Sequence, residues 1–302
     1  MKIKPRIREI NKYQYWGYLF ITPWIIGFIV LQLYPLLASL NYSFTDFNML
    51  NDPRYIGFQN YIRMFTKDVN FSQSVKVTLI RVLFAVPMKI IFALMVAMLL
   101  NIRLKGMNFY RTIFYLPSIF GGSVAISVLW KFLFMREGLI NRLLSVFSIK
   151  PVDWLGNPDI ALFTVSLVTI WEFGSSMVLF LAGLKQIPRE LYEAAKIDGA
   201  SLLKQFYYVT LPLLTPIVFF NLVMQTINAF QEFTTPFVIT SGGPAKSTYL
   251  YAMLIYENGF KFLKMGYASA LSWLMFIAII IITALVFKSS PYWVYYGDGG
   301  ST

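Results

Sequence analysis

The amino-acid sequence predicts an all-α membrane protein with six transmembrane helices. Of its 302 residues, 57% are hydrophobic and only 13% are charged, whereas a typical globular domain has about 25% charged residues. Long runs without any charge recur along the chain, and a helix that crosses a bilayer needs about 20 mostly apolar residues. The chain lacks Cys and His, so we expect no catalytic residues and no metal site.

Each expected span is placed by the charges that bound it. The apolar run behind the basic N-terminus is too long for a cleavable signal peptide, so we expect an uncleaved first span. The second span is interrupted by Arg81 and Lys89, and the fourth by Glu172. The six expected spans are Trp16–Leu40, Val77–Leu100, a segment of 112–130, Ile160–Leu184, a segment of 205–231 that starts near Pro212, and a segment of 265–287.

These spans divide the chain into a basic tail (1–15), a transmembrane domain (16–290) with one long loop (185–211), and a C-terminal tail (291–302). Taken together, the segments 1–15, 101–112, 185–211 and 288–302 have 13 Lys and Arg in 69 residues, whereas the intervening loops 41–74, 131–159 and 235–266 have 10 in 95. The segments richer in Lys and Arg usually face the cytoplasm, so we expect both termini there. The excess of 26 Lys and Arg over 14 Asp and Glu suits anionic membrane lipid, and no nucleic-acid partner is expected.

The loop between the fourth and fifth spans carries a short helix pattern. Pro188 is suited to the start of a helix and Gly199 to its end, and Ser201 can cap a second helix that leads into the fifth span. The spacing of Leu191, Ala194, Ala195 and Asp198 places them on one helical face, where alanine permits another backbone to approach closely. An ordinary interfacial helix would also satisfy this pattern.

The same loop resembles a known family signature. Glu193-Ala194-Ala195, followed by Gly199 and then by Val209-x-Leu211-Pro212, is similar to the EAA motif of binding-protein-dependent ABC importer permeases, with Val209 in place of the usual isoleucine. Nearly the whole chain resembles the sugar-permease branch related to the larger maltose-permease subunit. The other matching segments are Phe109–Pro117, Gly138–Asn141, Asp153–Leu155, Thr240–Pro244 and Ser247–Thr248.

The resemblance implies the type I ABC importer permease fold in a bacterial or archaeal cytoplasmic membrane. It implies that the loop is a coupling helix that docks on a cytoplasmic ATPase. The expected partners are a second homologous permease, two copies of the ATP-binding subunit, an extracytoplasmic solute-binding protein and a carbohydrate solute. ATP and Mg would be bound by the ATPase subunits, so this chain is expected to be no enzyme and to hold no cofactor. The implied coupling residues are Leu191, Glu193, Ala194, Ala195, Asp198 and Gly199.

The segment Gly242–Thr248 superficially resembles a phosphate-binding loop. That motif requires a glycine before its lysine, and its backbone amides cradle the phosphates. Here Ala245 precedes Lys246, and Pro244 removes an amide. We therefore expect a turn-rich outer loop.

Two polar stripes indicate a path for the solute. In the fifth span, Asn221, Gln225, Asn228 and Glu232 fall on one narrow helical face, and the fourth span offers Thr169, Glu172 and Ser176. Polar groups in a membrane usually face the bundle interior or a wet cavity. Their hydroxyls and amides can bind sugar hydroxyls, although hydrogen bonding between helices is an alternative role. Nearby aromatic side chains that could contact apolar sugar faces are Trp171, Phe173, Phe230 and Phe233.

Arg81 and Lys89 leave alternatives open. Arg81 lies near the expected outer end of its span, which favours a side chain that snorkels to the surface. For Lys89, which lies deeper, we expect an acidic partner such as Glu172 or Glu232. A minority interpretation is an acidic, uronate-type oligosaccharide as the solute. A self-sufficient secondary transporter or channel fits the hydropathy equally well, but it needs no EAA loop, and the inverted repeats common in secondary transporters are not found.

Overall fold

The computed structural model describes residues 7–102 and 105–295. Lys2, Lys4 and Arg6 of the predicted basic tail, and 296–302 of the predicted C-terminal tail, lie outside these ranges. Within the described ranges, every regular element is a helix apart from one isolated bridge between Thr45 and Tyr55. The contacts divide the chain into a first unit, Met1–Thr66 with Glu257–Trp273, and a second unit, Lys67–Tyr256 with Leu274–Thr302.

The described residues contain four continuous helical segments long and apolar enough to cross a membrane, and two bent helix pairs complete a set of six. The second span starts at Val69, eight residues before the expected Val77, because Asp68 caps it by accepting from the backbone N–H of Asn70 at 2.9 Å. The continuous segments are α1 (Ile7–Phe28) with η1 (Ile29–Leu33) and α2 (Tyr34–Ser43), α4 (Val69–Leu100), α11 (Leu202–Gln205) with η2 (Phe206–Thr210) and α12 (Leu211–Gln231), and α15 (Met265–Ser289) with η4 (Ser290–Tyr292).

The third and fourth spans are broken. We expected the third span to lie within 112–130, but α5 (Met107–Phe120) ends before Gly121 and α6 (Val124–Phe134) leaves at a steep angle. The bend between α5 and the stretch Val124–Val146 measures 102°. Gly122 permits this turn with a φ of +71°, which side chains with a Cβ rarely adopt. A 48° bend separates α8 (Pro158–Trp171) from α9 (Gly174–Gln186).

Two of the continuous segments contain a widened π-type turn just before a proline. η1 precedes Pro35, and η2 precedes Pro212. Proline lacks the N–H of a helical hydrogen bond and clashes with the carbonyl four residues earlier. A local widening of the helix removes that clash without ending the helix. Both spans therefore continue through their prolines.

The first unit also contains α3 (Gln59–Thr66) and η3 (Glu257–Lys261). Asn60 is buried and donates from its side-chain amide to the backbone oxygens of Ser43 and Thr45, at 2.9 and 2.8 Å. A Cβ at Gly266 would lie 2.2 Å from the same Thr45 oxygen. The start of α15 therefore packs directly on this backbone, because glycine has no side chain.

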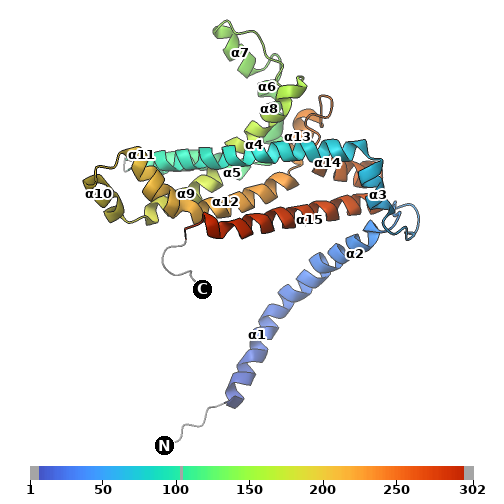
Figure 1. Ribbon diagram of the computed structural model, residues 1–302. Helices are drawn as coiled ribbons and strands as arrows, with labels where there is room; N and C mark the ends of the chain where they lie inside the picture. The colour runs from blue at the N-terminus through green and yellow to red at the C-terminus, as the bar shows by residue number, and fades with distance from the viewer. Residues whose placement is uncertain (1–6, 103–104, 296–302) are drawn as a thin grey trace, which may run out of the picture. The chain divides into compact units, whose positions relative to one another are not determined.

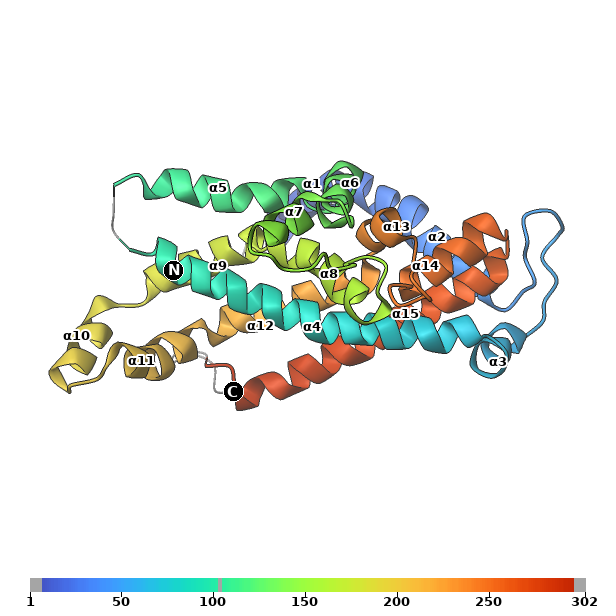
Figure 2. The ribbon, with the colours of Figure 1, turned by 90° about the horizontal axis from the view of Figure 1, so that it is seen from above.

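In the second unit, α4 packs against α8, α9, α12 and α14 (Tyr251–Tyr256) (Figures 1 and 2). Ala93 and Ala97 of α4 are fully buried in the core. A Cβ at Gly183 of α9 would lie 2.1 Å from the side chain of Ile217. Small residues therefore allow these helices to approach closely, which is how membrane helices gain packing energy.

Asn141 organises the loop that connects the third and fourth spans. It lies at the start of α7 (Leu139–Val146) and is 3% exposed. Its Oδ1 accepts from the backbone N–H of Val152 at 3.0 Å and from the indole N–H of Trp154 at 3.1 Å. Its amide also donates to the Val152 oxygen at 2.8 Å. Two of the family-like segments thus contact each other through one buried amide.

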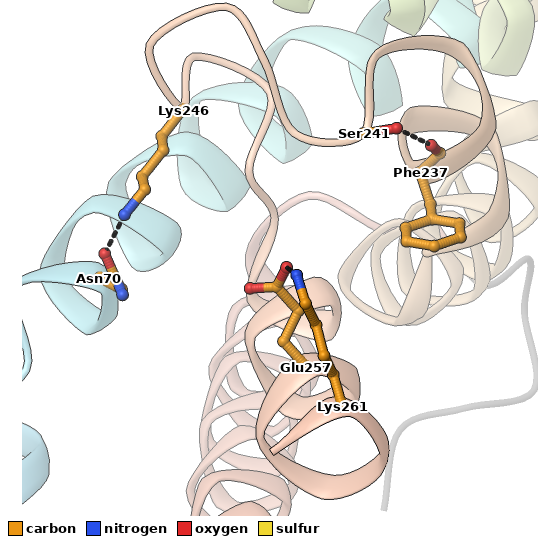
Figure 3. Close-up of polar contacts among 6 residues, drawn as sticks. All are labelled: Asn70, Phe237, Ser241, Lys246, Glu257 and Lys261. Atoms are coloured by element: carbon orange, nitrogen blue, oxygen red, sulfur yellow. Dashed lines mark hydrogen bonds and ion pairs between the residues drawn. The ribbon is translucent and has the colours of Figure 1, made fainter.

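The loop that follows α13 (Thr234–Thr240) is fixed by internal contacts. Figure 3 shows that Lys246 contacts the Asn70 side chain of α4 and that Ser241 donates to the Phe237 oxygen. The same figure also shows a separate ion pair of the first unit, between Lys261 and Glu257 at 3.4 Å. Thr248 donates to the Gly243 oxygen at 2.8 Å. The lysine of the superficial phosphate-loop pattern is therefore engaged within the chain.

The Asn141 contacts predict a local change in stability. In Asn141→Ala, the part-buried polar groups of Val152 and Trp154 lose their partners. Each group left unsatisfied costs about 1–3 kcal/mol. Opening of the segment 135–157 should become easier by about 2–4 kcal/mol, measured by hydrogen exchange of its backbone amides. Ser145→Ala removes one exposed hydrogen bond of the same helix and serves as the control. Equal exchange in the two variants would contradict this role of Asn141.

Candidate functional site

A cavity of about 370 Å³ lies where three helices of the second unit break. The breaks are those between α5 and α6, between α8 and α9, and between α12 and α13. In membrane proteins, irregular backbone is tolerated where it lines a cavity or is buried in protein. The residues that line this cavity are Val86, Lys89, Ser118, Gly121, Gly122, Thr169, Glu172, Ser175, Gln225, Asn228, Ala229, Gln231, Glu232, Phe233 and Thr234.

Two carboxylates satisfy backbone groups at these breaks. Glu172 Oε1 accepts from the backbone N–H of Gly122 at 2.9 Å. Glu232 Oε1 accepts from the backbone N–H of Thr235 at 3.1 Å, at the start of α13. A Cβ at Gly121 would lie 2.5 Å from Glu172 Cδ. Gly121 therefore provides the space in which Glu172 reaches the neighbouring break.

The expectation for Arg81 was wrong. Its side chain does not snorkel to the surface, because it is 1% exposed and points into the helix bundle. It donates to Thr169 Oγ1 at 2.7 Å and to the Ala229 oxygen at 3.3 Å. The early start of α4 at Val69 explains the difference, since it places Arg81 more than three turns inside the helix. Arg81 thus joins α4 to α8 and α12 beside the cavity.

Lys89 lines the cavity and is 7% exposed. Glu172 and Glu232 line the same cavity and attract it electrostatically. In the part of the chain that the structure describes, neither carboxylate lies within the 4.0 Å of a direct ion pair with Lys89. The ammonium group of Lys89 and the two carboxylates therefore line the same cavity without forming a direct ion pair.

The structure brings five of the seven residues of the predicted solute path to this cavity. Thr169, Glu172, Gln225, Asn228 and Glu232 line it, whereas Ser176 and Asn221 do not. Ser176 is fully buried and accepts from the Gln225 amide at 3.2 Å. Asn221 is 1% exposed and donates to the Ile217 oxygen of its own helix at 3.0 Å. These two side chains are buried in helix packing, which was the alternative role for polar groups in the spans.

Of the four aromatic candidates, Phe233 lines the cavity. Phe173 and Phe230 belong to the hydrophobic core, and Trp171 contacts Trp130 with ring centres 5.8 Å apart. The third span also contributes Ser118, Gly121 and Gly122 to the cavity, a contribution that was not predicted from the sequence. A glycine pair within an apolar run was the available signal, because glycine-interrupted spans often mark binding sites.

The short helix predicted between the fourth and fifth spans is present as α10 (Arg189–Ile197). Pro188 is its N-cap, and Gly199 follows its end with a φ of +74°. Tyr192 forms a hydrogen bond with Thr210 Oγ1 at 2.9 Å, which attaches α10 to the start of the fifth span. Ala195 is half-buried, whereas the other five predicted coupling residues, Leu191, Glu193, Ala194, Asp198 and Gly199, are exposed.

Among the described residues, no group of three or more Asp or Glu side chains comes together that could hold a metal ion. The cavity instead combines hydroxyl, amide and charged groups with one aromatic face, which are groups that bind a polar solute noncovalently.

Comparisons with known proteins agree with this architecture. Residues 70–295 match the family described as binding-protein-dependent transport system inner membrane component. The chain is 48% identical over 292 residues to the probable ABC transporter permease protein YesP of Bacillus subtilis (strain 168), which covers 96% of this chain and 94% of that protein. It is 33% identical over 275 residues to the trehalose/maltose transport system permease protein MalF of Thermococcus litoralis, covering 90% and 92%.

A solved structure shares the fold. A chain of a bacterial ABC transporter involved in the import of the acidic polysaccharide alginate superimposes with a TM-score of 0.80 at 24% identity, covering 95% of this chain and 99% of that chain. The family match, the two relatives and the shared fold extend over most of the chain. This protein is a multi-pass membrane protein that belongs to the permease family of binding-protein-dependent ABC importers.

Proposed function

We propose that this chain is a transmembrane subunit of an ATP-driven importer of a sugar or oligosaccharide, and that the cavity at the three helix breaks is its part of the solute path. The observation that carries the proposal is the position of the cavity between α8–α9 and α12, the two spans that flank α10. Family membership favours this function over that of a self-sufficient secondary transporter or channel.

The lining of the cavity supports a carbohydrate solute. Thr169, Gln225 and Asn228 offer hydroxyl and amide groups, and Phe233 offers an aromatic face. These groups suit a molecule with many hydroxyls and apolar ring faces. The name of the MalF relative, a trehalose/maltose permease, also supports a carbohydrate.

The charges of the cavity favour a neutral solute over an acidic one. Two carboxylates, Glu172 and Glu232, face one ammonium group, that of Lys89. Arg81 lies beside the cavity, but its guanidinium is already bonded to Thr169 and to a backbone oxygen. An additional carboxylate from a uronate would therefore meet no surplus of positive charge.

Helix α10 is suited to transmit movement to this cavity. It continues from α9 through Ile187 and Pro188, and Tyr192 attaches it to Thr210 before α12. Packed helices move as rigid units. A displacement of α10 would therefore also displace α8–α9 and α12, which form two walls of the cavity. Within the described residues, no atom lies within 4 Å of a Cβ placed on Gly199, so the end of α10 is open to a partner.

The partners in this proposal are a second homologous permease, two ATP-binding subunits that carry ATP and Mg, and an extracytoplasmic solute-binding protein. Both termini and the α10 loop would face the cytoplasm, as the distribution of Lys and Arg favours. The ATPase activity would belong to the partner subunits.

Gly199 provides the test of coupling. A side chain with a Cβ in the left-handed region costs about 1–2 kcal/mol, whereas Asn tolerates this region. In the assembled importer, Gly199→Leu should lower solute-stimulated ATP hydrolysis at least ~10-fold, since the end of α10 would be both strained and too large to dock. Gly199→Asn should retain most of the activity. Unchanged rates in Gly199→Leu would contradict a coupling role for α10.

Thiol labelling tests the solute path, because the native chain has no Cys. In the assembled importer, Asn228→Cys should react rapidly with a polar thiol reagent, since Asn228 is exposed within the cavity. Cys at Ser176 or Asn221 should react slowly, as should Cys at the control positions Leu222 and Ile227, which pack against the core. Equal labelling of Asn228→Cys and the controls would overturn the assignment.

Competition between solutes tests the charge argument. Neutral oligosaccharides should compete for uptake at least as well as uronate oligosaccharides of equal length in the native importer. If uronates compete better, and Lys89→Gln abolishes their advantage, the solute is acidic and the neutral interpretation is wrong.

A further inference from the structure

A second cavity, of about 960 Å³, lies beside α10 in the second unit. It is formed by the end of α4, the start of α5, the end of α9 and the first residues of α10. It is distinct from the cavity at the helix breaks, because the two cavities share no lining residue.

The lining of this second cavity is strongly basic. Lys105, Arg111, Lys185 and Arg189 contribute to it from four different segments, and none of its described lining residues is acidic. Four cations that share one concave space repel each other unless an anion lies between them. The charge of the cavity therefore favours an anionic ligand.

Arg111 is held in place with an unused donor. Its guanidinium donates to Asn108 Oδ1 at 2.9 Å and to the Leu100 oxygen at 3.0 Å. Its Nε is buried, and among the described residues it has no hydrogen-bond partner. A buried donor without a partner costs free energy, and an anionic oxygen is a favourable acceptor for a guanidinium.

The start of α5 adds to the same site. Gly106 is the N-cap of this 14-residue helix, and within 7–102 and 105–295 no side chain caps it. Gly106, Met107 and Asn108 line the cavity. Helix N-termini carry partial positive charge and unpaired backbone N–H groups, a combination that binds phosphate.

The cavity also has an apolar wall. Leu184 and Ile187 are buried there, and Ile102 lies at its edge with 53% of its surface exposed. A basic site next to an apolar surface, at the end of membrane-spanning helices, suits a molecule with an anionic headgroup and an acyl chain.

We propose that this cavity binds a phosphate group, and that the group belongs to the headgroup of an anionic glycerophospholipid. The phosphate lies among Lys105, Arg111, Lys185 and Arg189, and the acyl chain follows the apolar wall. Because Arg189 and Tyr192 of α10 line the cavity, the bound lipid also holds the start of α10. This inference does not depend on which solute is transported.

Lipid retention by the purified, assembled importer tests the proposal. The importer is incubated with a detergent-solubilised mixture of phosphatidylglycerol and phosphatidylcholine, and bound lipid is measured by mass spectrometry after washing. The native protein should retain phosphatidylglycerol selectively. Lys105→Gln/Lys185→Gln should retain about tenfold less, because two of the four cations are lost. The double variant Lys105→Arg/Lys185→Arg keeps both positive charges and should retain phosphatidylglycerol like the native protein.

The control variant also removes two lysine charges, and it removes them from segments that are expected to face the cytoplasm. Lys204 and Lys288 are exposed and lie outside the cavity, so Lys204→Gln/Lys288→Gln should retain lipid like the native protein. Equal retention in all variants, or equal loss in both Gln double variants, would overturn the site. Inorganic phosphate and glycerol 1-phosphate are added as competitors: displacement of lipid at millimolar concentration would assign the site to a soluble phosphate and overturn the lipid, whereas no displacement supports it.

Discussion

A helix that breaks inside a membrane frees backbone N–H groups, and each of them needs an acceptor because the hydrocarbon offers none. The second unit meets this constraint with carboxylates. Glu172 accepts from Gly122 across two spans, and Glu232 accepts from Thr235 within its own break. Since three breaks meet around one space, satisfying their backbone also concentrates polar groups there. The polar cavity follows from this requirement.

The charged residues around the cavity also hold its helices together. Arg81 is buried completely and joins α4 to Thr169 of α8 and to a backbone oxygen of α12. Removing one member of a buried set of charges and hydrogen bonds leaves the other members unpaired, which is costly. The same groups that build the cavity therefore also hold α8 and α12 against α4. A variant at this position therefore changes both the helix packing and the wall of the cavity.

The hairpin formed by α8 to α12 is polar and hydrogen-bonded at one end and has exposed apolar side chains at the other. At the cavity, Ser176 and Gln225 join α9 and α12 through a direct hydrogen bond. At the other end, α10 and α11 leave large apolar side chains uncovered: Leu191, Ile197 and Leu202 are 42%, 87% and 80% exposed. Exposed apolar groups at the tip of a rigid hairpin are typical of a surface that a partner covers. The hairpin thus links the polar cavity with an exposed apolar surface, and the proposed function assigns the first to the solute and the second to a partner.

The sequence by itself determined the apolar spans and the short helix between the fourth and fifth, because hydrophobic length and capping are local properties. Gly199 and Ser201 act at the ends of helices, as their types predict. Only the tertiary structure decided the break at Gly121–Gly122, the burial of Arg81 and the division of the polar stripe into Asn228 at the cavity and Asn221 in the packing. Each of these depends on contacts between helices far apart in sequence, and the chemical type of a residue does not specify which helix it faces.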